Sequence, residues 1–304
     1  MELRILIEAQ EGASYADQRN AAVLAEELGF DGFFRTDHLV PLGLGPETLA
    51  GQPTDAWTTL AGLATETGRI RLGTLVSNVG FRPIGPFAVT VTQVDAMSGG
   101  RLDLGIGAGW FEREHRAFGL AFPDVKTRVD RLEEQLEVLA RFWATPTGEA
   151  FSYAGEHVEL VECPGGYDGR DAPPIILGGH GKPRGLRMAV RHAAEFNLDF
   201  PRPGVAARVG PDLIAACSTA DRDPASLIFS AAHLACVGTT EEDVLRRAER
   251  AGLDLSLRLG GLIGTVDQVR QDLSELAAQG ISRFYLQVPD MRDEDHLRTL
   301  ARLL

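Results

Sequence analysis

Short apolar segments alternate with longer amphipathic segments along almost the whole chain. The first apolar segment, "LRILIEA" (3–9), predicts a strand, and residues 15–29 repeat apolar side chains at helical spacing before a glycine. The same alternation predicts further strands at 31–39, 69–77, 101–109, 173–179, 194–200, 227–237 and 281–288. It predicts further helices at 55–68, 86–100, 125–144, 184–193, 204–219, 241–251, 265–279 and 293–304, with Thr54 as the cap of the 55–68 helix. Residues 151–163 predict a β-hairpin outside the main sheet.

Eight strands with intervening helices predict an α/β fold with a parallel sheet, either closed into a barrel or open with helices on both faces. The number eight favours a (β/α)8 TIM barrel, for which about 250 residues are typical. The 304-residue chain leaves room for loop and hairpin insertions, expected at 38–54, 145–172 and 252–264. No linker or low-complexity segment interrupts the pattern, so residues 1–304 are expected to form one domain.

The composition of the chain limits the kinds of molecule that it is expected to bind. The formal net charge of −13 opposes nonspecific binding to nucleic acid or to an anionic membrane. Three cysteines far apart, Cys163, Cys217 and Cys236, indicate neither a disulfide framework nor a zinc site. The first residues, "MELRILIEAQ", do not resemble a secretory signal. We therefore expect a cytoplasmic protein that binds a small molecule at a local site, with no nucleic-acid or membrane partner.

Residues that follow the strands are the candidates for chemistry, because the active site of a TIM barrel lies at the carboxyl ends of its strands. Asp37 and His38 follow the second strand, and an imidazole beside a carboxylate titrates near neutral pH. The pair is interpreted either as an acid–base element or as loop structure. His115 has no partner at metal-ligand spacing, so no metal site is predicted.

Glycines occupy every second position at the end of the fourth strand, in "LGIGAGWFEREH" (104–115). Alternate residues of a strand share one face, so Gly105, Gly107 and Gly109 either admit a flat ligand or fit a tapering barrel. Trp110 and Phe111 follow directly, and they either stack on that ligand or anchor the next segment in the core.

A glycine-rich turn joins the fifth strand to its helix in "ILGGHGKPRG" (176–185). The backbone amides of this turn and the positive end of the helix dipole favour a phosphate, with an arginine nearby. The alternative is a plain tight turn. The candidate phosphate-binding residues are Gly178, Gly179, His180, Gly181 and Arg184.

Four stretches in order, "GFDGFFRTDHL", "RIRLGTLVSNVGFRP", "SGGRLDLGIGAGWFEREHRAFGLAFP" and "PPIILGGHGKPRGLRMAVRHAAEFNL", resemble the bacterial luciferase-like superfamily, most closely its coenzyme F420-dependent oxidoreductases. The resemblance implies a closed (β/α)8 barrel that binds coenzyme F420, or alternatively FMN. It implies a bulge under the flavin ring at Leu75, Val76 and Ser77, with a non-prolyl cis peptide at Leu75–Val76 or the next bond. The ring is then expected near Gly107, Ala108 and Gly109, which clear space for it, and the phosphate near residues 178–181.

The resemblance also implies roles for the pair after the second strand. His38 becomes a proton donor or an electrostatic partner of the reduced cofactor, and Asp37 orients it or binds polar groups. One departure is Trp110, because the sugar-phosphate dehydrogenases of the family place a glutamate there. Glu112 and Glu114 are interpreted either as replacements for that acid or as salt-bridge residues on a helix.

The predicted activity is hydride transfer between the deazaflavin and a small organic substrate. Two alternatives stay open: an FMN-dependent monooxygenase of the same superfamily, and a noncatalytic barrel that stores or senses a flavin or deazaflavin. A homodimer is compatible with the resemblance, whereas the substrate itself is not specified by the sequence.

Overall fold

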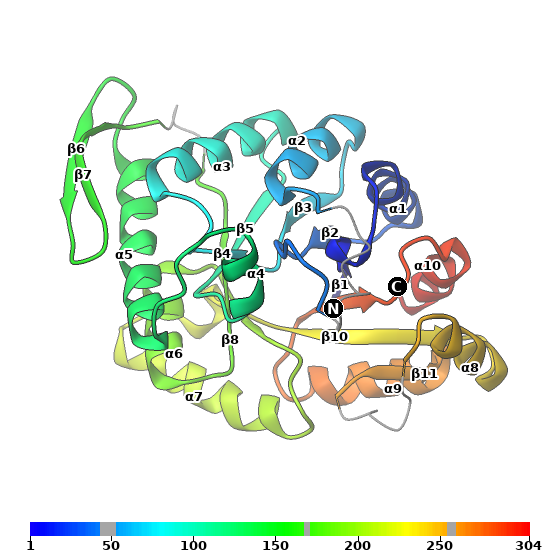
Figure 1. Cartoon of the computed structure of the whole chain (residues 1–304). Coiled ribbons are helices and arrows are strands. Elements are labelled where there is room, and N and C mark those ends of the chain that lie inside the picture. Colours follow the sequence, from blue (N-terminus) through cyan, green and yellow to red (C-terminus); the bar gives the residue numbers. More distant parts are fainter. Residues whose placement is uncertain (43–52, 167–170, 254–259) are drawn as a thin grey trace.

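Eight parallel strands close into a barrel, which confirms the predicted TIM-barrel fold (Figure 1). A computed structural model describes residues 1–42, 53–166, 171–253 and 260–304. Around the barrel the strands follow the order β1 (Glu2–Ile7), β2 (Gly32–Arg35), β3 (Arg71–Thr74), β5 (Leu102–Gly107), β8 (Ile175–Gly179), β9 (Glu195–Leu198), β10 (Ile228–Gly238) and β12 (Arg283–Val288). Pairing of β10 with β9 and of β12 with β1 closes the ring.

Helices surround the strands in Figure 1, as repeated β/α units require. They are α1 (Tyr15–Leu28), α2 (Ala56–Glu66), α3 (Ile84–Ser98), α4 (Glu112–Ala117), α5 (Val125–Ala144), α6 (Pro183–His192), α7 (Val205–Thr219), α8 (Glu241–Arg250), α9 (Val266–Ala277) and α10 (Glu294–Leu300), with short 3-10 turns at Ala9–Glu11, Pro224–Ser226 and Ala301–Leu303. None of the helices in the described ranges is both long and apolar enough to cross a bilayer.

Three short elements were not predicted: β4 (Ser77–Asn78), which pairs with β5, β11 (Leu262–Thr265), which pairs with β10, and α4. The predicted hairpin is confirmed as β6 (Ala150–Ala154) and β7 (Glu159–Pro164), and it lies beside α5 outside the barrel (Figure 1). Parts of the three predicted insertions, residues 43–52, 167–170 and 254–259, lie outside the described residues.

The expected cap of the second helix is wrong by one residue. Asp55, not Thr54, accepts the hydrogen bond from the Thr58 backbone N–H and caps α2. Thr54 instead accepts hydrogen bonds through Oγ1 from the buried side chains of Arg35 and Gln18. A carboxylate is also favoured at this position by the positive end of the helix dipole.

The inside of the barrel is layered along its axis. Successive residues of each strand point alternately inward and outward, so a ring of inward side chains forms at each level. The middle level is an apolar cluster separate from the larger core between strands and helices. Its buried members are Leu6, Phe34, Leu75, Ile176, Ala232 and Tyr285.

Charged side chains fill the N-terminal end of the barrel. The Arg4 guanidinium is 1% exposed and lies 2.7 Å from the Asp103 carboxylate, to which Arg71 also donates. On the other side of the ring, Arg283 pairs with the buried Glu195 carboxylate. A cavity of about 550 Å³ is lined by these residues. Because the charges of these residues pair with one another, we conclude that they stabilise this end of the barrel.

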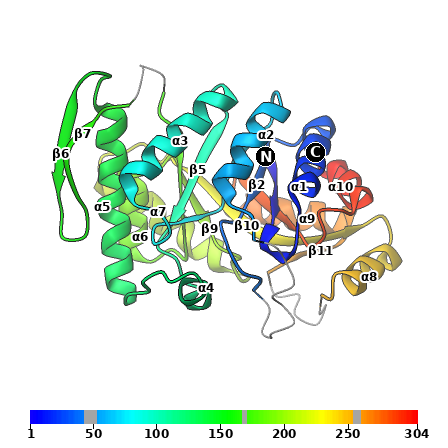
Figure 2. The same ribbon diagram turned by 45° about the horizontal axis from the view of Figure 1, so that its top comes forward.

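The opposite end of the barrel, where the strands finish, is called the mouth below. In Figure 2, α4 lies at the lower edge of the molecule, near this end. The apolar and charged layers described above fill the barrel beneath the mouth.

We predict that Asp103→Ala lowers the free energy of unfolding by about 3–5 kcal/mol, because it removes the buried carboxylate 2.7 Å from Arg4 and leaves the longer 3.5 Å contact with the half-exposed Glu2. Urea unfolding measures this change. The control is Asp267→Ala, since the Asp267 side chain is 92% exposed and its pairing with Arg270 is worth less than about 1 kcal/mol. Equal stability of the two variants would contradict a stabilising ionic layer.

Candidate active site

A one-residue bulge separates β3 from β4 at the mouth. Before it, Gly73 pairs with Asp103 of β5, and after it Ser77 pairs with Ile106, so β3–β4 uses one residue more than β5. The peptide bond Leu75–Val76 is cis and non-prolyl, at the first of the two expected positions. Leu75 joins the apolar cluster inside the barrel, and the half-buried Val76 packs against that cluster.

The alternating glycines of β5 make room for this bulge. A Cβ atom on Gly105 would lie 1.9 Å from the Thr74 carbonyl oxygen, and one on Gly107 would lie 2.8 Å from Val76 Cγ2. A Cβ on Gly178 of β8 would lie 3.2 Å from Val76 Cγ1. The expectation that Gly107 clears space for a ligand is therefore corrected: the bulge occupies that space and presents Val76 to the mouth.

His38 faces a buried carboxylate that the sequence analysis left without a defined role. Both carboxylate oxygens of Glu114 lie 3.1 Å from His38 Nδ1, and the Leu39 backbone N–H donates to Oε2 at 3.1 Å. Glu114 is 1% exposed, whereas the His38 side chain is 16% exposed at the mouth. The rings of Trp110 and Phe111 approach the imidazole edge-on, with centroid distances of 5.6 and 6.0 Å.

The surroundings of His38 favour its charged form. Burial alone lowers the pKa of an imidazole, but the hydrogen bond and negative charge of Glu114 outweigh this effect. The charges of Glu8 and Asp37 act in the same direction, so the pKa of His38 is raised above its ordinary value. The raised pKa means that His38 keeps its proton to higher pH than an ordinary imidazole.

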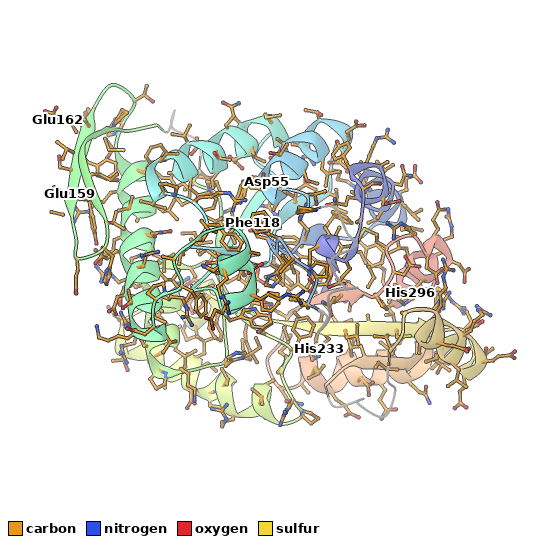
Figure 3. The ribbon with its side chains drawn as sticks, in the orientation of Figure 1. Asp55, Phe118, Glu159, Glu162, His233 and His296 are labelled. Atoms are coloured by element: carbon orange, nitrogen blue, oxygen red, sulfur yellow. The ribbon has the colours of Figure 1, made fainter. Side chains whose placement is uncertain are left out.

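Asp37 lies next to His38 in sequence but binds elsewhere. It is 3% exposed and receives two hydrogen bonds from the Arg82 guanidinium, one of them at 3.1 Å. Arg82 also pairs with Asp55, the cap of α2, which Figure 3 labels beside that helix. Burial raises the pKa of Asp37 and Arg82 partly offsets this effect. Asp37 thus ties the end of β2 to α2 and does not contact the imidazole.

A second histidine holds α4 against the bulge. His115 is fully buried, and its Nδ1 lies 2.9 Å from the Ala121 carbonyl oxygen, which only accepts. Nδ1 therefore donates, and Nε2 accepts from the Asn78 amide at 2.8 Å. Asn78 follows the bulge directly in β4. These bonds give His115 the partners that the sequence did not reveal, and they fix the helix that carries Glu114.

The turn between β8 and α6 has the predicted form. Pro183 is the first residue of α6, and no side chain caps the helix at Lys182. Gly181 has φ +72°, where a Cβ atom would also contact Val209 at 2.4 Å. Arg184 pairs with Asp130 and Glu133 of α5, so its guanidinium is already neutralised. His180 is exposed, 4.0 Å from Asp199.

The remaining predicted residues fall into two groups. Ala108 and Gly109 are half-buried beside the mouth, next to Trp110, which is 62% exposed and is therefore not a core anchor. Ser77 is buried, and its hydroxyl accepts from Trp57 Nε1 at 3.0 Å and donates to Thr74. The Ser77 side chain thus packs toward α2, leaving only its backbone near the bulge.

Glu8, which directly follows β1, is a mouth residue that was not among the selected candidates. Its carboxylate accepts hydrogen bonds from Thr36 Oγ1 at 3.0 Å, from Gln10 and from Gln287 at the end of β12. Its position after β1 was the available signal, because strand-end residues converge in a barrel. Glu114 was already a candidate, either as a replacement for the acid missing at Trp110 or as a salt-bridge residue, but the sequence did not show that it pairs with His38.

Comparison with known proteins identifies the family. A model of the luciferase-like monooxygenase family matches residues 2–291. The chain belongs to this family. Among curated proteins, it is 34% identical over 181 residues to an F420-dependent glucose-6-phosphate dehydrogenase of Nakamurella multipartita, covering 58% of this chain and 49% of that protein. The chain thus spans about half the length of the curated relatives it matches first.

Two solved structures of the family's fold span the chain. An F420-dependent secondary alcohol dehydrogenase in complex with an F420-acetone adduct has a TM-score of 0.86 and 17% identity, covering 100% of this chain and 98% of that one. The monooxygenase RslO1 from Streptomyces bottropensis has a TM-score of 0.81 and 21% identity, with coverage of 100% and 98%. At these identities the structures establish the shared barrel.

We predict that Gly105→Ala lowers the free energy of unfolding by about 1–3 kcal/mol, because its Cβ meets the backbone of Thr74. Gly85→Ala is the control. Gly85 lies in the first turn of α3, where the added Cβ would be 3.6 Å from Leu160 and would meet no neighbouring backbone, so the change should be smaller than about 1 kcal/mol. Thermal and urea unfolding compare the variants. A Gly105→Ala protein as stable as the wild type would refute the claim that the bulge packs against this glycine.

Proposed function

We propose that the protein is a coenzyme F420-dependent oxidoreductase that transfers a hydride between the deazaflavin and a small organic substrate. The observation that carries the proposal is the pairing of His38 with buried Glu114 at the mouth, beside the Val76 bulge. This arrangement keeps a proton next to the surface expected to hold a planar ring. The F420-dependent relative from Nakamurella multipartita supports the choice of coenzyme.

The turn after β8 suits the phosphate of such a coenzyme. The first-turn N–H groups of an α-helix lack intrahelical acceptors, and no side chain caps α6. We assign the phosphate to the amides of Gly179, His180 and Gly181, with the exposed Lys182 nearby. The carboxylates that pair with Arg184 compete with a phosphate for its guanidinium, so we give Arg184 a supporting role.

The bulge and the end of β5 suit the ring. Val76 offers an apolar surface at the mouth, and Gly107, Ala108 and Gly109 border it along the neighbouring strand. Leu75 and Ser77 hold the bulge from the inside of the barrel and from the side of α2, respectively. When bound, the coenzyme supplies or accepts the hydride.

The chain's own residues manage the proton. In the reducing direction, protonated His38 donates a proton to the substrate oxygen or nitrogen as the hydride arrives at carbon. Asp37 positions the loop through Arg82 and takes no part in proton transfer. We propose ketones, enones or imines as substrates, since each gains one hydride and one proton on reduction.

A second candidate is an FMN-dependent monooxygenase, which the structural similarity to RslO1 favours. A third is a barrel that binds the coenzyme without turnover. The experiment that separates them mixes the purified protein anaerobically with reduced F420 and a panel of ketones, enones and imines, and follows the absorbance of oxidised deazaflavin. Substrate-dependent oxidation supports the proposal. In a parallel aerobic assay, an oxygenated product formed only with reduced FMN and the protein supports the monooxygenase. Saturable binding of F420 without turnover supports storage.

We predict that His38→Asn lowers turnover on the order of 10²- to 10⁴-fold, because general acid catalysis is lost, while the dissociation constant of F420 stays nearly unchanged. Steady-state kinetics and fluorescence titration measure the two quantities. His157→Asn is the control, since its side chain is also 16% exposed but lies at the outer hairpin. Turnover equal to that of the control would remove His38 from the chemistry.

A further inference from the structure

Glu114 is a charged side chain placed in the protein interior with one titratable partner. Its carboxylate is 1% exposed and accepts from the Leu39 backbone N–H and from His38 Nδ1. Burying a carboxylate is costly unless hydrogen bonds and a positive charge compensate it. The ion pair with His38 supplies such a charge. The site therefore couples the charge of Glu114 to the protonation of His38.

We propose that Glu114 is a positioning residue that keeps the proton of His38 on Nδ1 and leaves Nε2 as the atom that exchanges a proton with the substrate. A carboxylate only accepts hydrogen bonds, so Nδ1 donates in both the charged and the neutral ring. No hydrogen bond to Nε2 is found among the residues that the structure describes. The substrate step rests on the proposed function, whereas the tautomer does not.

The fold holds Glu114 in this place from two sides. Its neighbour His115 is fixed by Asn78 and by the Ala121 carbonyl, so the helix cannot rotate freely. The Leu39 N–H joins the carboxylate to the same loop that carries His38. Glu112 lies two residues earlier in α4 but is exposed. The two glutamates thus differ in burial and in partner, although they share one helical turn.

The groups that face His38 come from several elements. They are Glu114 on α4, Glu8 after β1, Asp199 after β9, the adjacent Asp37 and the rings of Trp110 and Phe111. Of these, Glu114 makes the hydrogen bond and contributes the largest increase in the pKa of His38. Without the carboxylate charge, burial pulls the pKa down. The ring of a Glu114→Gln variant should therefore lose its proton at lower pH.

The proton balance of the step is complete. In reduction of a ketone, the carbonyl carbon gains a hydride for which the reduced deazaflavin of the proposed function would be the source, and the Nε2–H bond of the imidazolium breaks to form the alcohol O–H. The neutral ring that remains still donates from Nδ1 to Glu114. Solvent returns the proton to Nε2 before the next turnover, and oxidation of the alcohol follows the same path in reverse.

The first test measures His38 directly, without coenzyme or substrate. The chain has seven histidines, and His38→Asn assigns the His38 signals in a ¹⁵N-histidine NMR titration. We expect the neutral ring of the wild-type protein to carry its proton on Nδ1. We expect the pKa to fall in Glu114→Gln and to stay unchanged in Glu112→Gln. A neutral wild-type ring protonated on Nε2, or an equal pKa in all three proteins, overturns the proposal.

The second test compares ketone reduction by the same variants across pH. Activity that needs protonated His38 is lost as pH rises through its pKa, so Glu114→Gln should move this limb to lower pH. We expect kcat to fall on the order of 10- to 100-fold near neutral pH. Glu114→Asp should restore part of the loss, and Glu112→Gln should match the wild type. An unmoved pH limb with lowered kcat overturns the positioning role, whereas absence of turnover in the wild type refutes the proposed function alone.

Discussion

The packing of the Leu75–Val76 bulge against glycine backbone is the constraint on which the mouth depends. Without side chains at Gly105 and Gly107, β5 accepts an extra residue of β3–β4 at van der Waals distance. The resulting register brings Asn78 to His115, and that bond fixes α4. The residue before His115 in α4 is Glu114, which pairs with His38 in the loop after β2. The backbone geometry of the bulge is thus linked through three side chains, those of Asn78, His115 and Glu114, to the titration of the His38 imidazole.

The barrel separates stability from chemistry along its axis. At the N-terminal end, carboxylates and guanidinium groups neutralise each other around Arg4, and the middle level is apolar. At the mouth, Arg82 forms ion pairs with both Asp37 and Asp55, whereas the partner of Glu114 is His38. A histidine is the one of these cations that gives up its proton near neutral pH. On this ground we propose the mouth, and not the cavity at the other end, as the reactive side.

The strands, the main helices and the hairpin were predictable because their periodic patterns are long, and the barrel followed from their number. The position of the bulge and its cis peptide followed from family resemblance. The role of Gly107 could not be predicted, because a glycine in a sequence indicates only that space is needed and not what fills that space. The Glu114–His38 pair could not be predicted either. Helix α4 has six residues, too few for a periodic signal, and the two paired residues are 76 positions apart in the sequence. Arg184 was chosen as a nearby cation, but its acidic partners lie on another helix.

A crystal structure of the protein with bound oxidised F420 tests the central claim most directly. We expect the ring against Val76 with His38 Nε2 facing it, and the phosphate on the amides that follow Gly179. A coenzyme bound in the charged cavity at the N-terminal end, or a ring remote from both Val76 and His38, would contradict the assignment of the mouth as an F420 site.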